Sequence, residues 1–337
     1  MGESGELGSI GKTATAKCFF ERSGRAIPAK KSQPTHAKQI MKPTRLFYAF
    51  LAGSSLLLTP ALHAGDGTWD TDADGLWSDP LNWLGDTAPD IADGTDSTAT
   101  LGNFITGNRT ITLDSDRTIG NITASDTSHD YTISGANILT LDVTAGQSII
   151  DVTSAARTLT IDSVIAGTDG LVKNGAGTLS LSTSESAPHA NTFTGGTTIN
   201  AGTIKNVGAD SLGTGTISFA GDSELRAARV TGQVMTNSIQ INNGVTGQLN
   251  AINQFYRFNI NGVVSGSGTL WVTSTDNGNG QIFLNNTANT HTGKIIIGST
   301  AKSGNLITGS IADGAGAIEL GATTGTGNLT FANTTSA

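Results

Sequence analysis

Cysteine, histidine, charged residues and aromatic residues are all scarce in this sequence. The chain of 337 residues has one cysteine, five histidines, 14% charged residues and 5% aromatic residues. The cysteine, Cys18, precedes a predicted export signal, so the exported part can form neither a disulfide nor a thiolate metal site. The histidines are isolated and no G-x-S-x-G motif occurs, which leaves nucleophile triads and histidine-metal clusters without support.

The N-terminal part differs from the rest. Residues 1–40 are basic and unpatterned, which indicates a mispredicted upstream start or an extended signal region. Residues 41–64 place two basic residues before an apolar run from Leu46 to Leu58 and end in Ala64, the layout of a secretory signal peptide. A membrane anchor is the alternative, although the run falls short of the ~20 residues that span a bilayer. We expect export, with cleavage after Ala64.

The exported part is acidic. Nine of the 19 basic residues and three of the 27 acidic residues precede Gly65, which leaves 10 basic and 24 acidic residues and a net charge of −14. Such a surface repels phosphate backbones, and the basic and aromatic pattern of a nucleic-acid binder is absent. We predict no nucleic-acid partner.

Glycine is abundant, with 44 residues, near twice the usual share of roughly 7%. A pentad G-x-G-x-[LI] occurs six times, starting at Gly175, Gly213, Gly266, Gly278, Gly314 and Gly325. A dinucleotide-binding loop would open a helix, whereas each pentad leads into alternating apolar and polar residues. This pattern predicts a tight turn followed by a strand.

A longer repeat relates residues 159–202 to residues 258–299. Asn191-Thr-Phe-Thr-Gly195 matches Asn289-Thr-His-Thr-Gly293 at an offset of 98 residues. Strands without helical crossovers cannot form a doubly wound sheet. We therefore predict an all-β chain, a parallel β-helix (β-solenoid) whose stacked coils bury Leu, Ile and Val and expose Thr, Ser and Asn. The alternative is one or two β-sandwiches.

An aspartate-rich stretch lies near the start of the exported part. Asp70, Asp72 and Asp74 alternate before Gly75, as ligands do in an EF-hand calcium loop, but Leu81 stands where the bidentate carboxylate belongs. We expect a metal-free turn with the carboxylates facing solvent and no cofactor. Weak Ca²⁺ binding through these aspartates is the alternative.

Three tryptophans share this region. Residues 65–105 are predicted to form an N-terminal β cap in which Trp69, Trp77 and Trp83 cover the open first coil. The predicted β-solenoid then occupies residues 106–337.

The stretch GLVKNGAGTLSLS, followed by ANTFTGGTTINAGTI, resembles the autotransporter-associated β-strand repeat, or passenger-associated transport repeat, of secreted bacterial proteins. The resemblance covers residues 165–204 and, more loosely, residues 263–300, where His291 replaces an aromatic residue and Lys294 replaces the second glycine. The motif residues are Gly175, Gly177, Leu179, Asn191, Thr192, Phe193, Thr194, Gly195 and Gly196. The resemblance implies a parallel β-helical passenger outside the cell or at the bacterial cell surface and outer membrane. It supplies no catalytic residues.

Two hypotheses of function follow. The resemblance implies a non-catalytic rod for adhesion or for surface or matrix structure, with an unknown surface ligand, a polysaccharide or a cell surface as partner. The alternative is a carbohydrate-active enzyme, a polysaccharide lyase or hydrolase, for which Asp222 and Glu224 beside Arg226 give a weak acid pattern and residues 255–258 an aromatic zone. We predict the rod. The sequence stops within a coil at Ala337, so the family also implies an outer-membrane translocator or a sorting segment beyond this point.

Overall fold

The computed structural model describes residues 65–182, 190–208, 211–228, 233–252, 257–274, 280–298, 304–308, 318–320 and 327–331. The predicted extension, residues 1–40, and the predicted signal peptide, residues 41–64, lie outside this part. No helix among the described residues has the length and apolar character needed to cross a bilayer.

The strands form three ladders, in each of which one strand pairs with the corresponding strand of the next coil. The first ladder contains β1 (Gly67–Trp69), β3 (Gly94–Leu101), β5 (Arg117–Ala124), β7 (Ser148–Val152), β9 (Leu171–Asn174), β11 (Thr197–Ile199), β13 (Ile217–Phe219), β16 (Ile239–Ile241) and β19 (Val264–Gly266). The second contains β2 (Gly75–Leu76), β4 (Arg109–Thr112), β6 (Tyr131–Leu141), β8 (Thr158–Gly167), β10 (Thr178–Leu181), β12 (Gly202–Asn206), β14 (Ser223–Ala227), β17 (Thr246–Ala251), β20 (Thr269–Thr273), β22 (Ile295–Ile297) and β24 (Ile318–Leu320). The third contains β15 (Gln233–Met235), β18 (Arg257–Ile260), β21 (Gln281–Leu284), β23 (Gly304–Thr308) and β25 (Gly327–Phe331).

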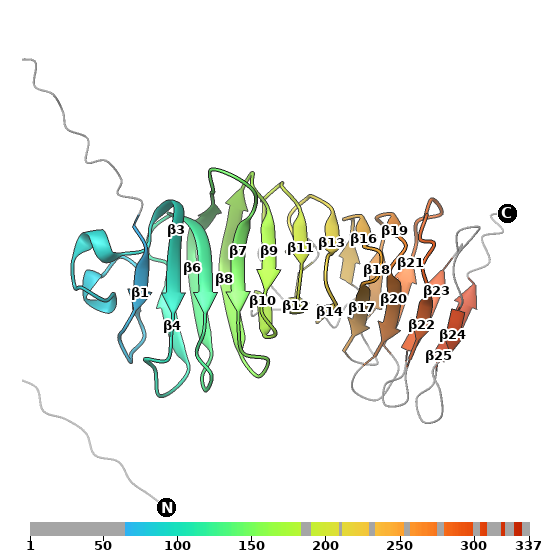
Figure 1. Cartoon of the computed structure of the whole chain (residues 1–337), viewed down its shortest axis with the longest axis horizontal. Helices are drawn as coiled ribbons and strands as arrows, with labels where there is room; N and C mark the ends of the chain where they lie inside the picture. The colour runs from blue at the N-terminus through green and yellow to red at the C-terminus, as the bar shows by residue number, and fades with distance from the viewer. Residues whose placement is uncertain are drawn as a thin grey trace, which may run out of the picture. The chain divides into compact units, whose positions relative to one another are not determined.

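The described ladders are parallel throughout, and their partners lie one coil apart. Partner residues in the second ladder are separated by as few as 20 residues, between Thr158 and Thr178, and by as many as 36, between Gly75 and Ile111. Figure 1 shows the strands of successive coils side by side from the N-terminal cap to the last strand. This arrangement confirms the predicted parallel β-solenoid and excludes the β-sandwich alternative, because sandwich sheets are antiparallel.

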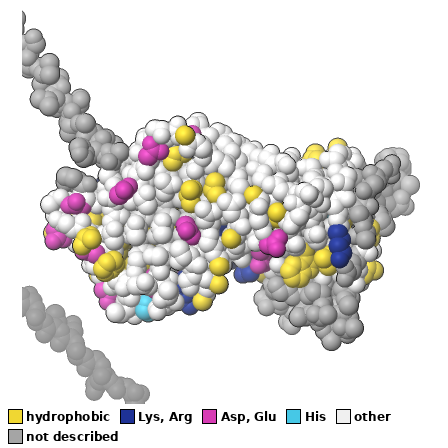
Figure 2. Space-filling model, in the orientation of Figure 1, with side chains coloured by type: hydrophobic (Ala, Val, Ile, Leu, Met, Phe, Trp, Pro, Cys, Tyr) yellow, Lys and Arg dark blue, Asp and Glu magenta, His cyan; other side chains and the backbone are white. Residues whose placement is uncertain are grey.

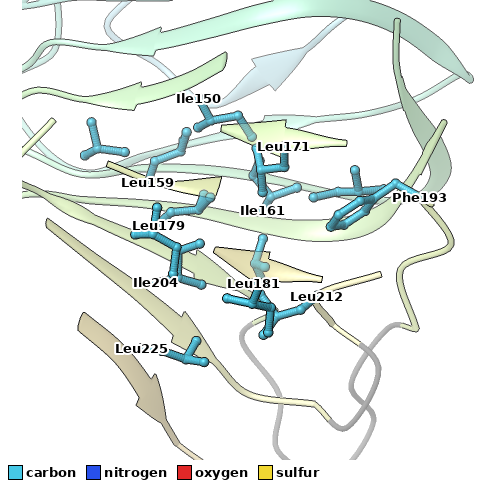
Figure 3. Close-up of a cluster of buried hydrophobic side chains, with 14 of the residues drawn as sticks. Ile150, Leu159, Ile161, Leu171, Leu179, Leu181, Phe193, Ile204, Leu212 and Leu225 are labelled. Atoms are coloured by element: carbon cyan, nitrogen blue, oxygen red, sulfur yellow. The ribbon is translucent and has the colours of Figure 1, made fainter. Parts of the chain in front are cut away.

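The core is a column of aliphatic side chains in register. Leu159, Leu179, Ile204, Leu225 and Leu249 are successive partners in the second ladder, and all are fully buried. Figure 3 shows four of them one below the other. Since side chains alternate between the two faces of a strand, the residues next to them point outward. The six G-x-G-x-[LI] pentads lead into β10, β13, β20, β21, β24 and β25, as predicted.

The N-terminal end is closed by tryptophan side chains. Between β2 and β3 the chain forms two short 3₁₀ helices, Pro80–Asn82 and Ala88–Asp90. The rings of Trp69, Trp77 and Trp83 are fully buried, and the Trp83 ring centroid lies 5.4 Å from that of Trp69 and 5.2 Å from that of Trp77. Each indole N–H donates to a backbone carbonyl, as buried indoles require. The expected burial of these three rings is therefore observed.

Candidate functional site

The first copy of the repeat motif connects three successive coils through one buried amide. The Asn191 Oδ1 accepts a hydrogen bond from the backbone N–H of Ile165 at 2.8 Å, and its Nδ2 donates to the carbonyl of Ser211 at 2.7 Å. The backbone N–H groups of Thr192 and Thr194 donate to the carbonyls of Ile165 and Gly167 in the preceding coil. The motif therefore satisfies backbone groups at a corner where no regular strand is present.

The second copy repeats the bonds to the preceding coil, whereas its Asn289 Nδ2 has no hydrogen-bond partner among the described residues. The Asn289 Oδ1 accepts from the backbone N–H of Val264 at 2.9 Å. The N–H groups of Thr290 and Thr292 donate to the carbonyls of Val264 and Gly266, each at 2.9 Å. The two copies thus share one local geometry despite their different sequences.

The central position of the motif points into the core in both copies. Phe193 is fully buried, and His291 occupies the equivalent place with 5% of its surface exposed. Neither imidazole nitrogen of His291 makes a well-aligned hydrogen bond among the described residues, although backbone groups of Ser265 and Lys294 lie near the ring. Burial lowers the pKa of His291, and these backbone groups offset part of that effect.

The motif glycines lie where coils approach closely. A Cβ on Gly195 would lie 2.4 Å from the backbone of Asp169, and a Cβ on Gly293 would lie 1.7 Å from the carbonyl oxygen of Gly268. Gly196 has φ of +85°, a conformation that favours glycine. Gly175, Gly177 and Leu179 precede or begin β10, where the two glycines abut the preceding coil and Leu179 is fully buried.

Lys173, within the stretch that resembles the repeat, is fully buried in β9. Its Nζ donates to the carbonyl oxygens of Asn174, Gly175 and Ala201. Burial lowers the pKa of Lys173 to about 8, and the negative charge of Asp151 opposes this shift. Three carbonyl acceptors are what a buried ammonium group needs, so this lysine joins two coils at their corner.

The aspartates of the suspected calcium loop bond to the next coil. Asp72 accepts hydrogen bonds from the backbone N–H and hydroxyl of Thr106 and from Arg109, with an Arg109 Nη2 to Asp72 Oδ1 distance of 2.7 Å. The bonds from Thr106, followed by those from Arg109, lower the pKa of Asp72 to about 2. Asp74 accepts from the backbone N–H of Thr110 at 2.7 Å. Both carboxylates are exposed, as we expected, and they also bond to the following coil.

The same device recurs along the solenoid. An aspartate at a corner accepts a backbone N–H from a strand of the following coil, in the pairs Asp66–Thr98, Asp116–Ile138, Asp130–Thr158 and Asp222–Thr246. The alternating aspartates before Gly75 are thus one instance of a general coil-to-coil contact. Within the described ranges, no group of three or more His, Cys, Asp or Glu side chains is placed to hold a metal ion. The calcium alternative stays a prediction.

A groove lies on the outer face of the second ladder. Thr203, Glu224, Gln248 and Trp271 are successive partners on β12, β14, β17 and β20, and they alternate with the core residues of those strands. A cavity of about 410 Å³ is lined by Gly202, Thr203, Asp222, Ser223, Glu224, Thr246, Gln248 and Trp271, which we call the ladder groove. Of these, Asp222 and Glu224 had been singled out from the sequence.

The acids of the ladder groove are held by neighbours. Arg226 donates to both carboxylate oxygens of Glu224 at 2.8 Å, and Asn250 donates to Glu224 Oε1 at 2.5 Å. The ladder partners of Glu224 are Thr203 and Gln248, so no second acid stacks on it in the adjacent coils. The acid pair that a lyase or hydrolase needs is therefore not formed by Glu224 and its ladder neighbours.

The aromatic zone predicted at residues 255–258 is placed only in part, since residues 255 and 256 lie outside the described residues. Phe258 is fully buried in the core. Arg257 is exposed, and its guanidinium carbon lies 6.0 Å from the ring centroid of Phe283. Arg257 and Phe258 lie on β18 of the third ladder, whereas Glu224 and Arg226 lie on β14 of the second.

Thr203, Gln248 and Trp271 were not identified from the sequence. The spacings between successive groove partners are 21, 24 and 23 residues, from Thr203 to Glu224, Gln248 and Trp271. Because coil length varies, no fixed period brings these residues together. One sequence signal could have identified them, since each of these three outward residues immediately precedes a core residue of its strand.

Comparisons with known proteins also identify the repeat segment. The family model described as Passenger-associated-transport-repeat matches residues 171–205. The "Adhesin BmaC autotransporter" of Brucella suis biovar 1 (strain 1330) is 34% identical over 149 residues, which cover 44% of this chain and 4% of that protein. The chain thus matches only a small part of that relative's length, and no solved structure matches the chain. Residues 171–205 of this chain are therefore similar to the passenger-associated transport repeat, in the region where the sequence resemblance had placed it.

Proposed function

We propose that this chain is a non-catalytic rod for adhesion or for surface or matrix structure. The observation that carries the proposal is the continuous aliphatic column, which leaves the outer positions of each coil free to vary without loss of the fold. The name of this relative, an autotransporter adhesin, supports adhesion. Figure 2 shows acidic side chains at several places on the face in view and few basic ones.

Export is part of the same proposal. Residues 41–64 act as a signal peptide, the solenoid lies outside the cell or at the bacterial surface, and an outer-membrane translocator is the partner for secretion. The repeat match over residues 171–205 supports this route. Replacing the apolar run from Leu46 to Leu58 with a polar sequence is expected to retain the chain inside the cell, as measured by protease accessibility of intact bacteria.

The enzyme alternative has weaker support. Glu224 is paired with Arg226 and bonded by Asn250, whereas a general acid or base needs access to the reacting group. A screen of the full chain for reducing-sugar release from acidic and neutral polysaccharides tests this alternative. Cleavage of any substrate would refute the non-catalytic proposal and support the enzyme alternative.

Adhesion is tested with the full chain coupled to beads. Coupled beads are expected to attach to epithelial monolayers or polysaccharide-coated plates above the level of beads that carry heat-denatured chain. Equal attachment of both bead types would refute adhesion by the folded solenoid.

We propose no cofactor. Since Asp72 and Asp74 already accept hydrogen bonds from Thr106 and Thr110, Ca²⁺ would have to displace these contacts. Calorimetric titration with millimolar Ca²⁺ is expected to give no binding heat and no rise in melting temperature, and either signal would establish the calcium site.

A further inference from the structure

The ladder groove combines an aromatic ring with hydrogen-bonding groups in one cavity. Trp271 is partly exposed, and its indole N–H donates to the carbonyl of Gly298 at 3.0 Å, which fixes the ring against the next coil. A fixed, partly exposed indole presents an apolar face that can stack on another flat or apolar group. The cavity volume, about 410 Å³, lies within the usual range of about 300 to 1,000 Å³ for small-molecule sites.

The polar groups of the groove leave acceptors available. Gln248 is 8% exposed, its Nε2 donates to the Thr273 hydroxyl at 2.7 Å, and its Oε1 accepts no hydrogen bond from the described residues. Because this oxygen is not fully enclosed, a donor from a ligand can take the place of the solvent that it otherwise meets. Asp222 adds a second acceptor, because its Oδ1 accepts the N–H of Thr246 and its Oδ2 accepts no hydrogen bond from the part of the chain that the structure describes.

The charge of the groove selects among ligands. The two charged residues in its lining are both acidic, Asp222 and Glu224, and the positive charge of Arg226 is directed to Glu224. Phosphate, sulfate and uronate groups are therefore repelled. Acceptor oxygens, hydroxyl groups of Thr203 and Thr246, and an apolar ring together match a neutral molecule with hydroxyl donors on its edge and C–H groups on its face.

We propose that the ladder groove binds a neutral saccharide, with one sugar ring stacked on Trp271 and its hydroxyl groups donating to Gln248 Oε1 and Asp222. The proposal deepens the adhesive function and rests on it for its biological use. It concerns binding alone, because Glu224 is already committed to its ion pair.

The test is titration of the full chain with di- to tetrasaccharides of glucose, galactose, mannose and N-acetylglucosamine, and with oligogalacturonate and sialyllactose as anionic probes. Three of the four tryptophans are buried in the cap, so a change in indole fluorescence on binding reports mainly on Trp271. At least one neutral probe is expected to bind more tightly than either anionic probe. Absence of binding by every neutral probe, or preference for an anionic one, would overturn the proposal.

Variants locate the site. Trp271→Ala is expected to weaken binding about tenfold or more, equivalent to about 1.4 kcal/mol, and Asp222→Asn to weaken it less while leaving the exposed corner folded. Phe283→Ala, an outward ring on β21 outside the groove, is the matched control and is expected to bind normally. Unchanged binding by Trp271→Ala and Asp222→Asn, measured by calorimetry on variants with normal melting curves, would contradict the assignment.

The bead assay separates the two proposals. Absence of saccharide binding by the parent chain, with normal attachment of beads, would refute the groove assignment and leave the adhesive rod supported. Saccharide binding without attachment of beads would keep the groove and remove the adhesive function.

Discussion

The two copies of the repeat motif lie on different ladders of the solenoid. The strand that follows the first copy, β11, belongs to the first ladder, and the strand that follows the second, β22, belongs to the second. Both copies keep the asparagine bond to the preceding coil, at 2.8 and 2.9 Å, and the first glycine. The motif is therefore a local device for turning a coil, and it does not depend on which face of the solenoid it occupies.

The differences between the copies show which positions are less constrained. The central side chain changes from Phe193 to His291, and both are buried. The second glycine changes from Gly196, with positive φ, to Lys294, which is not among the residues with positive φ. The asparagine and the first glycine set the geometry, whereas the ring and the second glycine tune its stability.

The largest effect is expected for the buried ring of the first copy. Phe193→Ala leaves a cavity in the core and is expected to destabilise the solenoid by about 3–5 kcal/mol. His291→Ala, its counterpart, is expected to cost less because the imidazole is poorly satisfied. Urea unfolding of both variants, followed by tryptophan fluorescence and circular dichroism, measures the difference, and equal losses would show that the two sites are equivalent.

The asparagines come next. Asn191→Ala and Asn289→Ala each leave a buried backbone N–H unpaired, and each is expected to cost about 1–3 kcal/mol. Asn191→Ala is expected to cost more, because its amide also donates to Ser211. Hydrogen exchange at Ile165 and Val264 reads out each lost bond directly.

The control for these asparagine variants is Asn285→Ala, which removes an exposed amide pair with Asn261 and is expected to change stability by less than about 0.5 kcal/mol. An asparagine variant that behaves like this control would show that the motif bond contributes nothing.

The second glycine position has a smaller effect. Gly196→Ala places a Cβ 2.8 Å from the carbonyl oxygen of Thr216 at a φ of +85°, which is expected to cost on the order of 1–2 kcal/mol. Lys294→Ala, at the matching position, requires no such strain and is expected to lower stability by less. Thermal melting compares the two, and a larger loss in Lys294→Ala would reverse the comparison.

The smallest effect depends on pH. Because burial lowers the pKa of His291 in the folded chain, the unfolded chain binds a proton first as pH falls below about 6.5. The solenoid is then expected to lose stability as pH falls through and below that value. His291→Phe is expected to reduce this loss, and Phe193→His is expected to increase it.

Melting temperatures of these two variants and the parent chain, measured from pH 7.5 to pH 5, test the expectation. Identical pH profiles for His291→Phe and the parent would show that other groups control the response. A pH profile of Phe193→His that equals the parent profile would show that a histidine at this position does not make stability depend on pH.

The fold could be predicted from the sequence because its signals are local. The alternation after each glycine pair predicts a strand, and the repeated Asn-Thr-x-Thr-Gly motif predicts stacked coils; both features appear in the ladders. The ladder groove could not be predicted, because Thr203, Gln248 and Trp271 meet only when the length of every intervening coil is known. The contacts of Asp72 and Asp74 were missed for the same reason, since their partners Thr106 and Thr110 lie in the next coil.

The variable coil length has a consequence for evolution. Each coil adds one interstrand step, about 4.7–4.9 Å, to the axis whether it contains 20 or 28 residues. Surplus residues leave the column at its corners, so an insertion there alters the surface residues without changing the length of the solenoid. Duplication of a whole coil lengthens the solenoid and repeats the same surface residues. Length and specificity can thus be selected independently in one polypeptide.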